Sequence, residues 1–327
     1  MTGVSNSSEM KTKIKAEAEK LGFCFCGFTA AGIPTDFPRY ERWLESDPYG
    51  TMTWMARADH IAKRADLRAL LPEVRTVCVL GVPMPLVAPA DEYAVASYAH
   101  YADYHDSIKD LAEKLIAAVD LDCPYRICVD AEPILERSLA VQAGLGWIGK
   151  SSMFISPTSG SAVLLCEILL GVEIEPDAPY TKDGCGTCKR CVEACPGRCI
   201  DPETRTIRAD RCVAYLTIEH KGEFTAEQRA IVGTRLFGCD ECLRACPWNS
   251  RSARQTPLPP ASAIPTPADA SLSEQEYKQK FQNTPAQRLK SRGLRRNVEA
   301  VEENIVTSDQ GPVTSDQGPE RPIFERQ

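Results

Sequence analysis

Cys185-Gly-Thr-Cys188-Lys-Arg-Cys191-Val-Glu-Ala-Cys195-Pro196 is the first of two cysteine runs in this chain of 327 residues. The second run is Cys239-Asp-Glu-Cys242-Leu-Arg-Ala-Cys246-Pro247, and Cys212 lies between the two. Runs spaced C-x2-C-x2-C-x3-C-P are typical of ferredoxin-type 4Fe–4S sites, in which the last cysteine ligates the other cluster. The two runs therefore predict a module that carries single electrons.

The spacing also predicts which cysteines share a cluster. Two intervening residues let a tight turn aim successive thiolates at one cluster, whereas the cysteine before each proline points away from it. One cluster would be held by Cys185, Cys188, Cys191 and Cys246, and the other by Cys195, Cys212, Cys239 and Cys242. Cys199 is then left without a role. Structural zinc is the alternative, but zinc sites rarely carry two Cys-Pro endings.

Composition points to an ordinary globular protein. Charged residues make up 25% and hydrophobic residues 43% of the chain, which has room for two domains. Residues 1–8 are polar, and no stretch approaches a membrane span. Fifteen cysteines without an export signal argue against disulfides and favour a cytoplasmic protein. A net charge of −7 means that any contact with RNA must be local.

Hydrophobic periodicity before the cysteine runs predicts a mixture of helices and strands, and hence an α+β fold. Cys24 and Cys26 alternate with phenylalanines, which predicts strand packing rather than a ligand pair. Segment 40–55, whose residues 49–55 are rich in aromatic residues and methionines, is either a core helix or a hydrophobic wall for a large planar ligand. The predicted helices are 9–21, 98–118 and 134–143, and the predicted strands are 23–29, 76–82, 126–130, 153–155 and 162–170.

Three glycines, Gly144, Gly146 and Gly149, match the G-x-G-x-x-G pattern of dinucleotide-binding loops. The pattern follows a predicted helix rather than a strand, which argues against a dinucleotide site. We expect instead a loop in which the backbone closely approaches another part of the molecule.

The sequence after the cysteine runs changes character three times. Residues 251–270 are rich in Pro, Ala, Ser and Thr, which predicts a loop that wraps over the body, and a helix is predicted at 273–281. Five basic residues between Gln287 and Asn297 form either a solvated face or a phosphate-binding patch. The heptad 306–312 repeats unchanged as 313–319, which predicts a disordered tail over 306–327.

Five motifs together give the chain a resemblance to the cobalamin-dependent epoxyqueuosine reductases over about residues 11–298. These motifs are Val129-Asp130-Ala-Glu-Pro, Ala143-Gly-Leu-Gly-Trp-Ile-Gly-Lys150, Cys212-Val-Ala-Tyr-Leu-Thr-Ile-Glu-His-Lys-Gly222, Gly238-Cys-Asp-Glu-Cys242 and Cys246-Pro-Trp-Asn249. The combination is more specific to that family than any one motif.

The resemblance implies a domain organisation. A nitroreductase-like domain, residues 1–176, would bind cobalamin and carry out catalysis. A ferredoxin-like module with two 4Fe–4S clusters would follow at 177–250. A wrapping segment with the basic patch would occupy 251–305, and the tail would follow at 306–327. We expect a monomer.

The resemblance also implies an activity, the reduction of epoxyqueuosine to queuosine at the wobble position of tRNA. Electrons would pass from an external one-electron donor, such as a flavodoxin or ferredoxin, through both clusters to cobalamin. Many family members continue into helical repeats that hold tRNA, and without them the contact would rest on residues 288–296 and the cluster module. The alternatives are a corrinoid and iron–sulfur reductase of small molecules, similar to reductive dehalogenases, and an electron carrier without catalysis.

By the same resemblance Asp130 is the proton donor, with Glu136 in reserve. Burial beside the corrin would bring the pKa of Asp130 near the operating pH, although an aspartate here could instead cap the next helix. Asp103-Tyr104-His105 begins like an axial-histidine motif but has Ile108 in place of glycine, so we expect His105 either to be structural or to contact a residue of the site rather than the cofactor. The residues that match cobalamin contacts of the family are Asp130, Arg64, Lys150, Ser151, Phe154, Leu165 and Val213.

Overall fold

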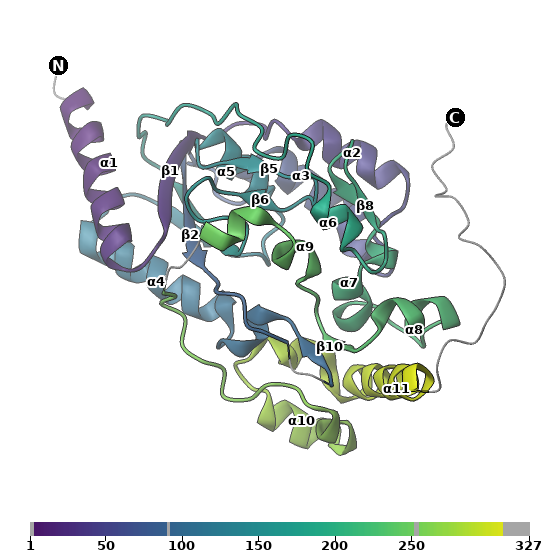
Figure 1. Cartoon of the computed structure of the whole chain (residues 1–327). Coiled ribbons are helices and arrows are strands. Elements are labelled where there is room, and N and C mark those ends of the chain that lie inside the picture. Colours follow the sequence, from purple (N-terminus) through teal and green to yellow (C-terminus); the bar gives the residue numbers. More distant parts are fainter. Residues whose placement is uncertain (1–2, 90–91, 252–254, 310–327) are drawn as a thin grey trace.

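A four-stranded antiparallel sheet lies at the centre of the N-terminal part of the computed structural model, which describes residues 3–89, 92–251 and 255–309 (Figure 1). Its strand order is β1-β2-β7-β4. The strands are β1 (Phe25–Ala30), β2 (Thr76–Pro83), β4 (Tyr125–Cys128) and β7 (Val163–Leu170). All eight residues of β2 are buried, because β2 has a neighbour on each side and helices over both faces. The predicted inner strands are confirmed.

Helices cover both faces of this sheet. On one face, α1 (Gly3–Lys20) and α4 (Tyr104–Val119) pack Ile14 and Leu115 against Leu80 and Ile168. On the other, α5 (Glu136–Gln142) packs Leu139 against the sheet. The helix predicted over 98–118 is in fact divided, because a 3-10 turn at 97–100 ends before Asp103 caps α4.

The cysteines of the sheet are packing residues, as the alternation predicts. Cys24 and Cys78 are buried, and the Sγ atoms of Cys26 and Cys78 lie 3.7 Å apart across β1 and β2. The contact with Cys26, and then burial, raise the pKa of Cys78 and favour its neutral thiol. These residues therefore belong to the core and not to a ligand set.

The cysteine-rich module consists of short elements joined to the N-terminal part. Parallel strands β3 (Ala94–Val95) and β10 (Arg235–Phe237) pair across the two segments. A shared core forms around them, with Phe237 packed against Tyr277 and Leu294. Helices α10 (Glu274–Lys280) and α11 (Lys290–Asp309) complete it (Figure 1). The cores thus cross the predicted domain boundaries, which stay predictions.

The remaining elements are short and form much of the cavity wall described below. The helices are α2 (Phe37–Glu45), η1 (Thr53–Ala56), α3 (Ala58–Ala65), η2 (Leu67–Ala69), η3 (Ser97–His100), α6 (Arg190–Glu193), η4 (Ala209–Arg211), α7 (Val213–Ile218), α8 (Ala226–Val232), α9 (Glu241–Arg244), η5 (Pro247–Arg251), η6 (Pro267–Ser271) and η7 (Pro285–Leu289). The strands are β5 (Trp147–Ile148), β6 (Phe154–Ile155), β8 (Ile200–Asp201) and β9 (Thr206–Ile207). Within the described ranges, none of the helices combines the length and the apolar character that a membrane crossing requires.

The segment that follows the cysteine runs packs against the N-terminal part at two described points. Leu258 enters the core beside α1 and α4, and Pro260 forms a bridge with Tyr101. Ser273 and Glu276 form a capping box, which explains the predicted helix at 273–281. Because α11 continues to Asp309, residues 306–309 of the predicted tail are helical, and residues 310–327 lie outside the described ranges.

The glycine-rich loop makes the close backbone approach that its composition predicts. A Cβ atom on Gly146 would lie 2.0 Å from the carbonyl oxygen of Ile155. We expect Gly146→Ala to lower the free energy of unfolding by roughly 3 kcal/mol, because the obstacle is backbone and cannot rotate away. Thermal unfolding checks this, with Gly32→Ala as control, since no atom lies within 4 Å of the added methyl there. Equal melting temperatures for the two variants would contradict the prediction.

Candidate active site

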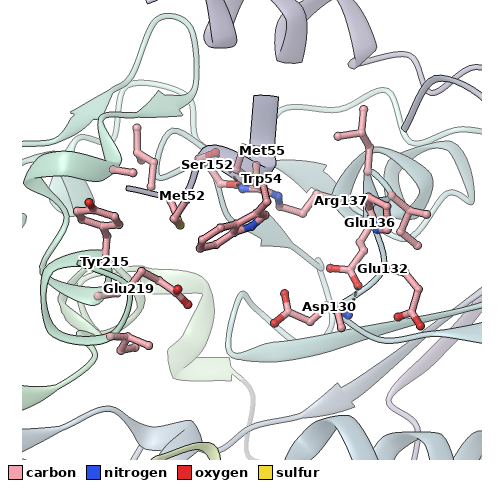
Figure 2. Close-up of a pocket in the computed structure, with 18 of the residues that line it drawn as sticks. Met52, Trp54, Met55, Asp130, Glu132, Glu136, Arg137, Ser152, Tyr215 and Glu219 are labelled. Carbon is pink, nitrogen blue, oxygen red and sulfur yellow. Dashed lines mark hydrogen bonds between the residues drawn. The ribbon is translucent and has the colours of Figure 1, made fainter. Parts of the chain in front are cut away.

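A cavity of about 960 Å³ lies between the N-terminal part and the C-terminal helices (Figure 2). Its wall includes η1, the loop that follows β4, the first residues of α5, and parts of α7 and η7. This volume is at the upper end for ligand sites and suits a large molecule. Met52, Trp54 and Met55 all line it, which favours the hydrophobic-wall interpretation of segment 49–55.

Asp130 lies on this wall, two residues after the end of strand β4. Its backbone has φ of 54°, a left-handed conformation that aspartate tolerates better than most residues. Its Oδ2 atom accepts a hydrogen bond from the hydroxyl of Tyr104 at 2.6 Å and lies 3.4 Å from Nε2 of His105. The alternative role as helix cap is wrong, because Leu135 occupies the N-cap position of α5 without a side-chain cap.

The ionisation of Asp130 differs from the expectation. Burial acts to raise the pKa of Asp130, but the hydrogen bonds of His105 and Tyr104 outweigh it and hold that pKa below its usual value. Asp130 is therefore a carboxylate at neutral pH in this structure. Asp130 must receive a proton before it can donate one. The neighbouring acids are therefore relevant as further proton donors in the cavity.

His105 links two carboxylates rather than serving packing alone. Its Nδ1 atom lies 2.8 Å from Oδ1 of Asp103, and its Nε2 atom faces Asp130. Burial opposes the charged ring, but the two carboxylates prevail and raise the pKa of His105 to about 9. The imidazolium at neutral pH therefore holds Asp130 in place and keeps it ionised.

This linkage makes the contribution of His105 to stability depend on pH. A group with a pKa of about 9 in the folded chain, against 6.5 unfolded, stabilises fully below pH 6.5, and the effect is lost as the pH rises through 9. We expect His105→Gln to lower the free energy of unfolding by about 2 kcal/mol near pH 6 and by almost nothing near pH 10.

The measurement is chemical denaturation of both proteins across this range. His220→Gln is the control, because burial lowers the pKa of His220 and its contribution should not fade between pH 6.5 and 9. A constant difference for His105→Gln would show that the imidazolium does not pair with the carboxylates.

The structure brings the cysteines together in the two predicted sets. A second, small pocket is lined by Cys185, Cys188, Cys191 and Cys246. Burial raises the pKa of Cys242, and the charges that raise it further are, in order, those of Cys239, Cys212, Cys195 and Cys191. The second set therefore surrounds Cys242, with Cys191 of the first set next to it. Within the described ranges, no three His, Cys, Asp or Glu side chains are grouped to hold a single metal ion.

Two cysteines of the module have notable positions. Cys212 also lines the large cavity, so the second set adjoins it. Cys199 is buried, with its Sγ atom 3.4 Å from that of Cys195. The thiol that spacing leaves without a role therefore lies beside a predicted ligand.

Of the six further residues predicted to contact cobalamin, Arg64 lines the cavity, where its guanidinium lies 5.1 Å from the ring centre of Tyr40. Lys150 instead donates to the carbonyl oxygens of Gly186 and Cys188, at 2.6 and 3.1 Å, within the first cysteine run. The other four do not line the cavity in this structure and stay predictions. They are Ser151, Phe154, Leu165 and Val213.

Sequence reasoning assigned Arg288 to the basic patch rather than to the cavity, and it missed Tyr215 and Glu219. Arg288 binds Glu219 with 2.5 Å between Nε and Oε1, and it lies 6.0 Å from the ring centre of Trp54. Tyr215 and Glu219 come from the quoted motif that begins at Cys212, but nothing in their spacing indicates a site. Their contribution depends on how α7 packs against η7.

The basic patch between Gln287 and Asn297 is only partly a surface. Arg296 is 7% exposed, lies 4.1 Å from the ring centre of Phe224 and donates to the carbonyl oxygens of Leu216 and His220. It is therefore a structural residue, contrary to its assignment to a binding surface. The exposed basic residues are Arg288, Lys290, Arg292 and Arg295.

A cavity that contains carboxyl groups and adjoins two cysteine sets is typical of a redox enzyme. Comparisons with known proteins agree with this class. Residues 184–249 match a family model described as a 4Fe-4S double cluster binding domain. Residues 64–131 match one described as epoxyqueuosine reductase QueG, DUF1730.

Individual relatives give the same answer. An epoxyqueuosine reductase of Leadbetterella byssophila is 35% identical over 300 residues, which cover 89% of this chain and 98% of the relative. A solved epoxyqueuosine reductase from Streptococcus thermophilus superposes with a TM-score of 0.80 at 26% identity, covering 90% of this chain and 81% of that one. An epoxyqueuosine reductase solved with an epoxyqueuosine-modified tRNA-Tyr stem loop gives 0.76 at 25% identity, with 91% and 82% covered. The chain belongs to the epoxyqueuosine reductase family, and it is an oxidoreductase.

Proposed function

We propose that this enzyme reduces epoxyqueuosine to queuosine in tRNA, with cobalamin held in the large cavity and electrons supplied through two 4Fe–4S clusters. The observation that carries the proposal is the position of Cys212, which belongs to the second cysteine set and also lines the cavity that contains Asp130. Electrons leaving that cluster have a short path to the acid that would complete the reaction.

The cavity fits cobalamin in size and in the character of its wall. Its volume of about 960 Å³ accommodates a large planar ring, against which Trp54 and the two methionines can pack. Arg64 and Arg137 lie on the same wall and can bind amide and phosphate groups at the ring edge. When bound, cobalamin supplies a strongly reducing, nucleophilic cobalt ion. We further propose that the N-terminal part is the nitroreductase-like, cobalamin-binding domain.

In this proposal the chain itself supplies protons and position. Reduction of the epoxide breaks two C–O bonds, forms one C=C bond and releases water, and it consumes two electrons and two protons. Asp130, once it has taken up a proton from solvent in the cavity, gives that proton to the epoxide oxygen as the first C–O bond breaks. Tyr104 and His105 fix its carboxyl group toward the cavity through the contacts described above.

The order of the cysteine sets suggests where electrons enter. Cysteines of both sets are partly exposed, but it is the second set that adjoins the cavity, through Cys212. We propose that a flavodoxin or ferredoxin delivers single electrons to the first cluster, which passes them to the second.

Contact with tRNA would be local in this proposal. Arg288 and Lys290 line the cavity, and Arg292 lies in the first turn of α11, so three exposed cations lie close together in the sequence. The relative solved with a modified tRNA stem loop supports this class of substrate. Such a contact weakens with salt, because each neutralised phosphate releases counterions.

The test is anaerobic purification and reconstitution, followed by assay with tRNA that carries epoxyqueuosine. We expect about eight irons and one cobalamin per chain, and queuosine in the digested product. Cofactor binding without turnover of tRNA, together with reduction of small organohalides, would support a reductive-dehalogenase-like enzyme instead. Bound zinc in place of iron would refute the proposal.

A further inference from the structure

A fully buried acid lies behind Asp130, on the inner strand β7. Glu167 is 0% exposed, in the otherwise apolar sequence Val163-Leu-Leu-Cys-Glu-Ile-Leu-Leu170. Among the described residues, no hydrogen-bond donor reaches either of its carboxyl oxygens. An ionised carboxylate in such a place is energetically costly, so the fold keeps Glu167 protonated.

The partner of Glu167 is a second acid. Glu136, in the first turn of α5, lies near enough for its carboxyl group to interact with that of Glu167. Two carboxylates are both acceptors, so they can bond only if one of them carries a proton. Burial and the charge of Glu136 both raise the pKa of Glu167 well above its usual value. At neutral pH Glu167 is therefore the donor of this pair and Glu136 the acceptor.

Glu136 connects this pair to the cavity. Its Oε1 atom accepts the backbone N–H of Asp130 at 2.8 Å, and its carboxyl group points toward Asp130 at the cavity wall (Figure 2). Burial, and then the negative charge of Asp130, raise the pKa of Glu136 to about 8. Glu136 is thus mostly protonated at neutral pH, while Asp130 is ionised.

The groups around the pair leave it neutral. The nearby Lys109 pairs with Glu132, with 3.9 Å between Nζ and Oε1. The groups that interact electrostatically with Glu136 are Asp130, Glu132, Arg137, Arg64 and Glu167. Those that interact electrostatically with Glu167 are Glu136, Glu132, Cys128 and Cys166. The two arginines also contact other groups. Arg137 donates a hydrogen bond to Ser152, and Arg64 stacks on Tyr40.

The proposed reaction, on which this inference rests, requires a second proton donor. Two protons are consumed for each epoxide, and Asp130 can hold only one. We propose that Glu136 is the second acid of the cavity and gives its proton to the oxygen that leaves as water, while Glu167 donates a hydrogen bond to the carboxylate that remains. Glu136 would be catalytic, and Glu167 a positioning residue.

The pair suits this role because the carboxylate that remains on Glu136 after proton donation is stabilised by hydrogen bonds. After Glu136 has lost its proton, its carboxylate accepts the hydroxyl of Glu167 and the backbone N–H of Asp130. Two donors compensate for burial, so Glu136 releases its proton more readily than an isolated buried acid. Solvent entering the cavity after product release would restore the proton.

The protonation of the pair is tested by infrared spectroscopy of the reconstituted protein at neutral pH. We expect Glu167→Gln, which is nearly isosteric with the neutral acid, to remove a carboxylic-acid carbonyl band that shifts in heavy water. If the difference spectrum shows loss of a carboxylate band instead, Glu167 is ionised and the inference is overturned. This measurement needs no substrate, so it is independent of the proposed function.

The role of the pair is tested by single-turnover kinetics across pH. The wild-type rate should fall above about pH 8, where Glu136 ionises. We expect the rate of Glu136→Gln to be about 100-fold lower than that of wild type and to show no decrease above about pH 8. Glu136→Asp should recover part of the wild-type rate. Glu136→Gln with the wild-type rate and profile would overturn the assignment.

Substitutions of Glu167 separate hydrogen bonding from packing. Glu167→Gln still donates to Glu136 and should stay within about threefold of wild type, whereas Glu167→Met should lose about tenfold. Equal rates for the two variants would overturn the positioning role. Glu113→Gln is the matched control, because Glu113 accepts from Tyr125 away from the cavity.

Failure of wild type to reduce the tRNA epoxide would refute the proposed function, and this outcome is read separately from the infrared result.

Discussion

Asp130→Asn should abolish epoxide reduction, lowering the single-turnover rate by about 100-fold to 10,000-fold, the usual contribution of a general acid. The amide has the size of the carboxyl group and can accept from Tyr104, but it holds no acidic proton. Asparagine also tolerates the left-handed backbone at this position, where φ is 54°. The fold and the binding of both cofactors should therefore be unchanged.

The measurement is the yield of queuosine from modified tRNA with pre-reduced enzyme. Iron and cobalamin contents, together with the melting temperature, show whether Asp130→Asn remains intact. Asp106→Asn is the control, because Asp106 is exposed on α4 and does not line the cavity. If Asp130→Asn kept full activity, the assignment of the proton donor would be wrong, and Glu136 would be the first residue to test.

Cys212→Ala should remove one of the two clusters and stop turnover. The change deletes one thiolate of the predicted set Cys195, Cys212, Cys239 and Cys242, and no other element between the runs can replace it except Cys199. We expect iron to fall from about eight to about four per chain. Because that cluster would be the one beside the cavity, electrons entering at the first cluster could not reach the site.

Cys199→Ala is the matched control for this prediction. It removes a neighbouring buried thiol, 3.4 Å from Cys195, and should leave about eight irons and the activity intact. Iron analysis with electron paramagnetic resonance of the reduced protein distinguishes the variants. Four irons in Cys199→Ala and eight in Cys212→Ala would exchange the roles of the two cysteines.

The sequence was most informative where spacing alone determines chemistry. Cysteine spacing predicts both ligand sets, which the structure brings together, and hydrophobic periodicity predicts the inner strands β2 and β7. The start of α4 was placed too early, because Asp103 begins a new helix within an unbroken helical pattern. Capping by a side chain depends on a backbone conformation that periodicity does not reveal.

The ionisation of the site was less predictable. Burial was expected to raise the pKa of Asp130, but the result is set by His105 and Tyr104, which tertiary packing brings to it. Arg296 looked like its basic neighbours, although it is buried against backbone carbonyls. The charged residue within strand β7, Glu167, was the one visible signal of the acid pair, since charge is rare in an inner strand.

The parallel pairing of β3 with β10 has a consequence for how the enzyme is made. Residues 94–95 emerge from the ribosome long before their partner strand, and the surrounding core also needs α10 and α11. Contacts this distant in sequence form slowly. The cysteines of the module therefore reach their final positions only near the end of folding. Metallocentre assembly should accordingly be a late, post-translational event, and truncation after the cysteine runs should yield a chain that loads iron poorly.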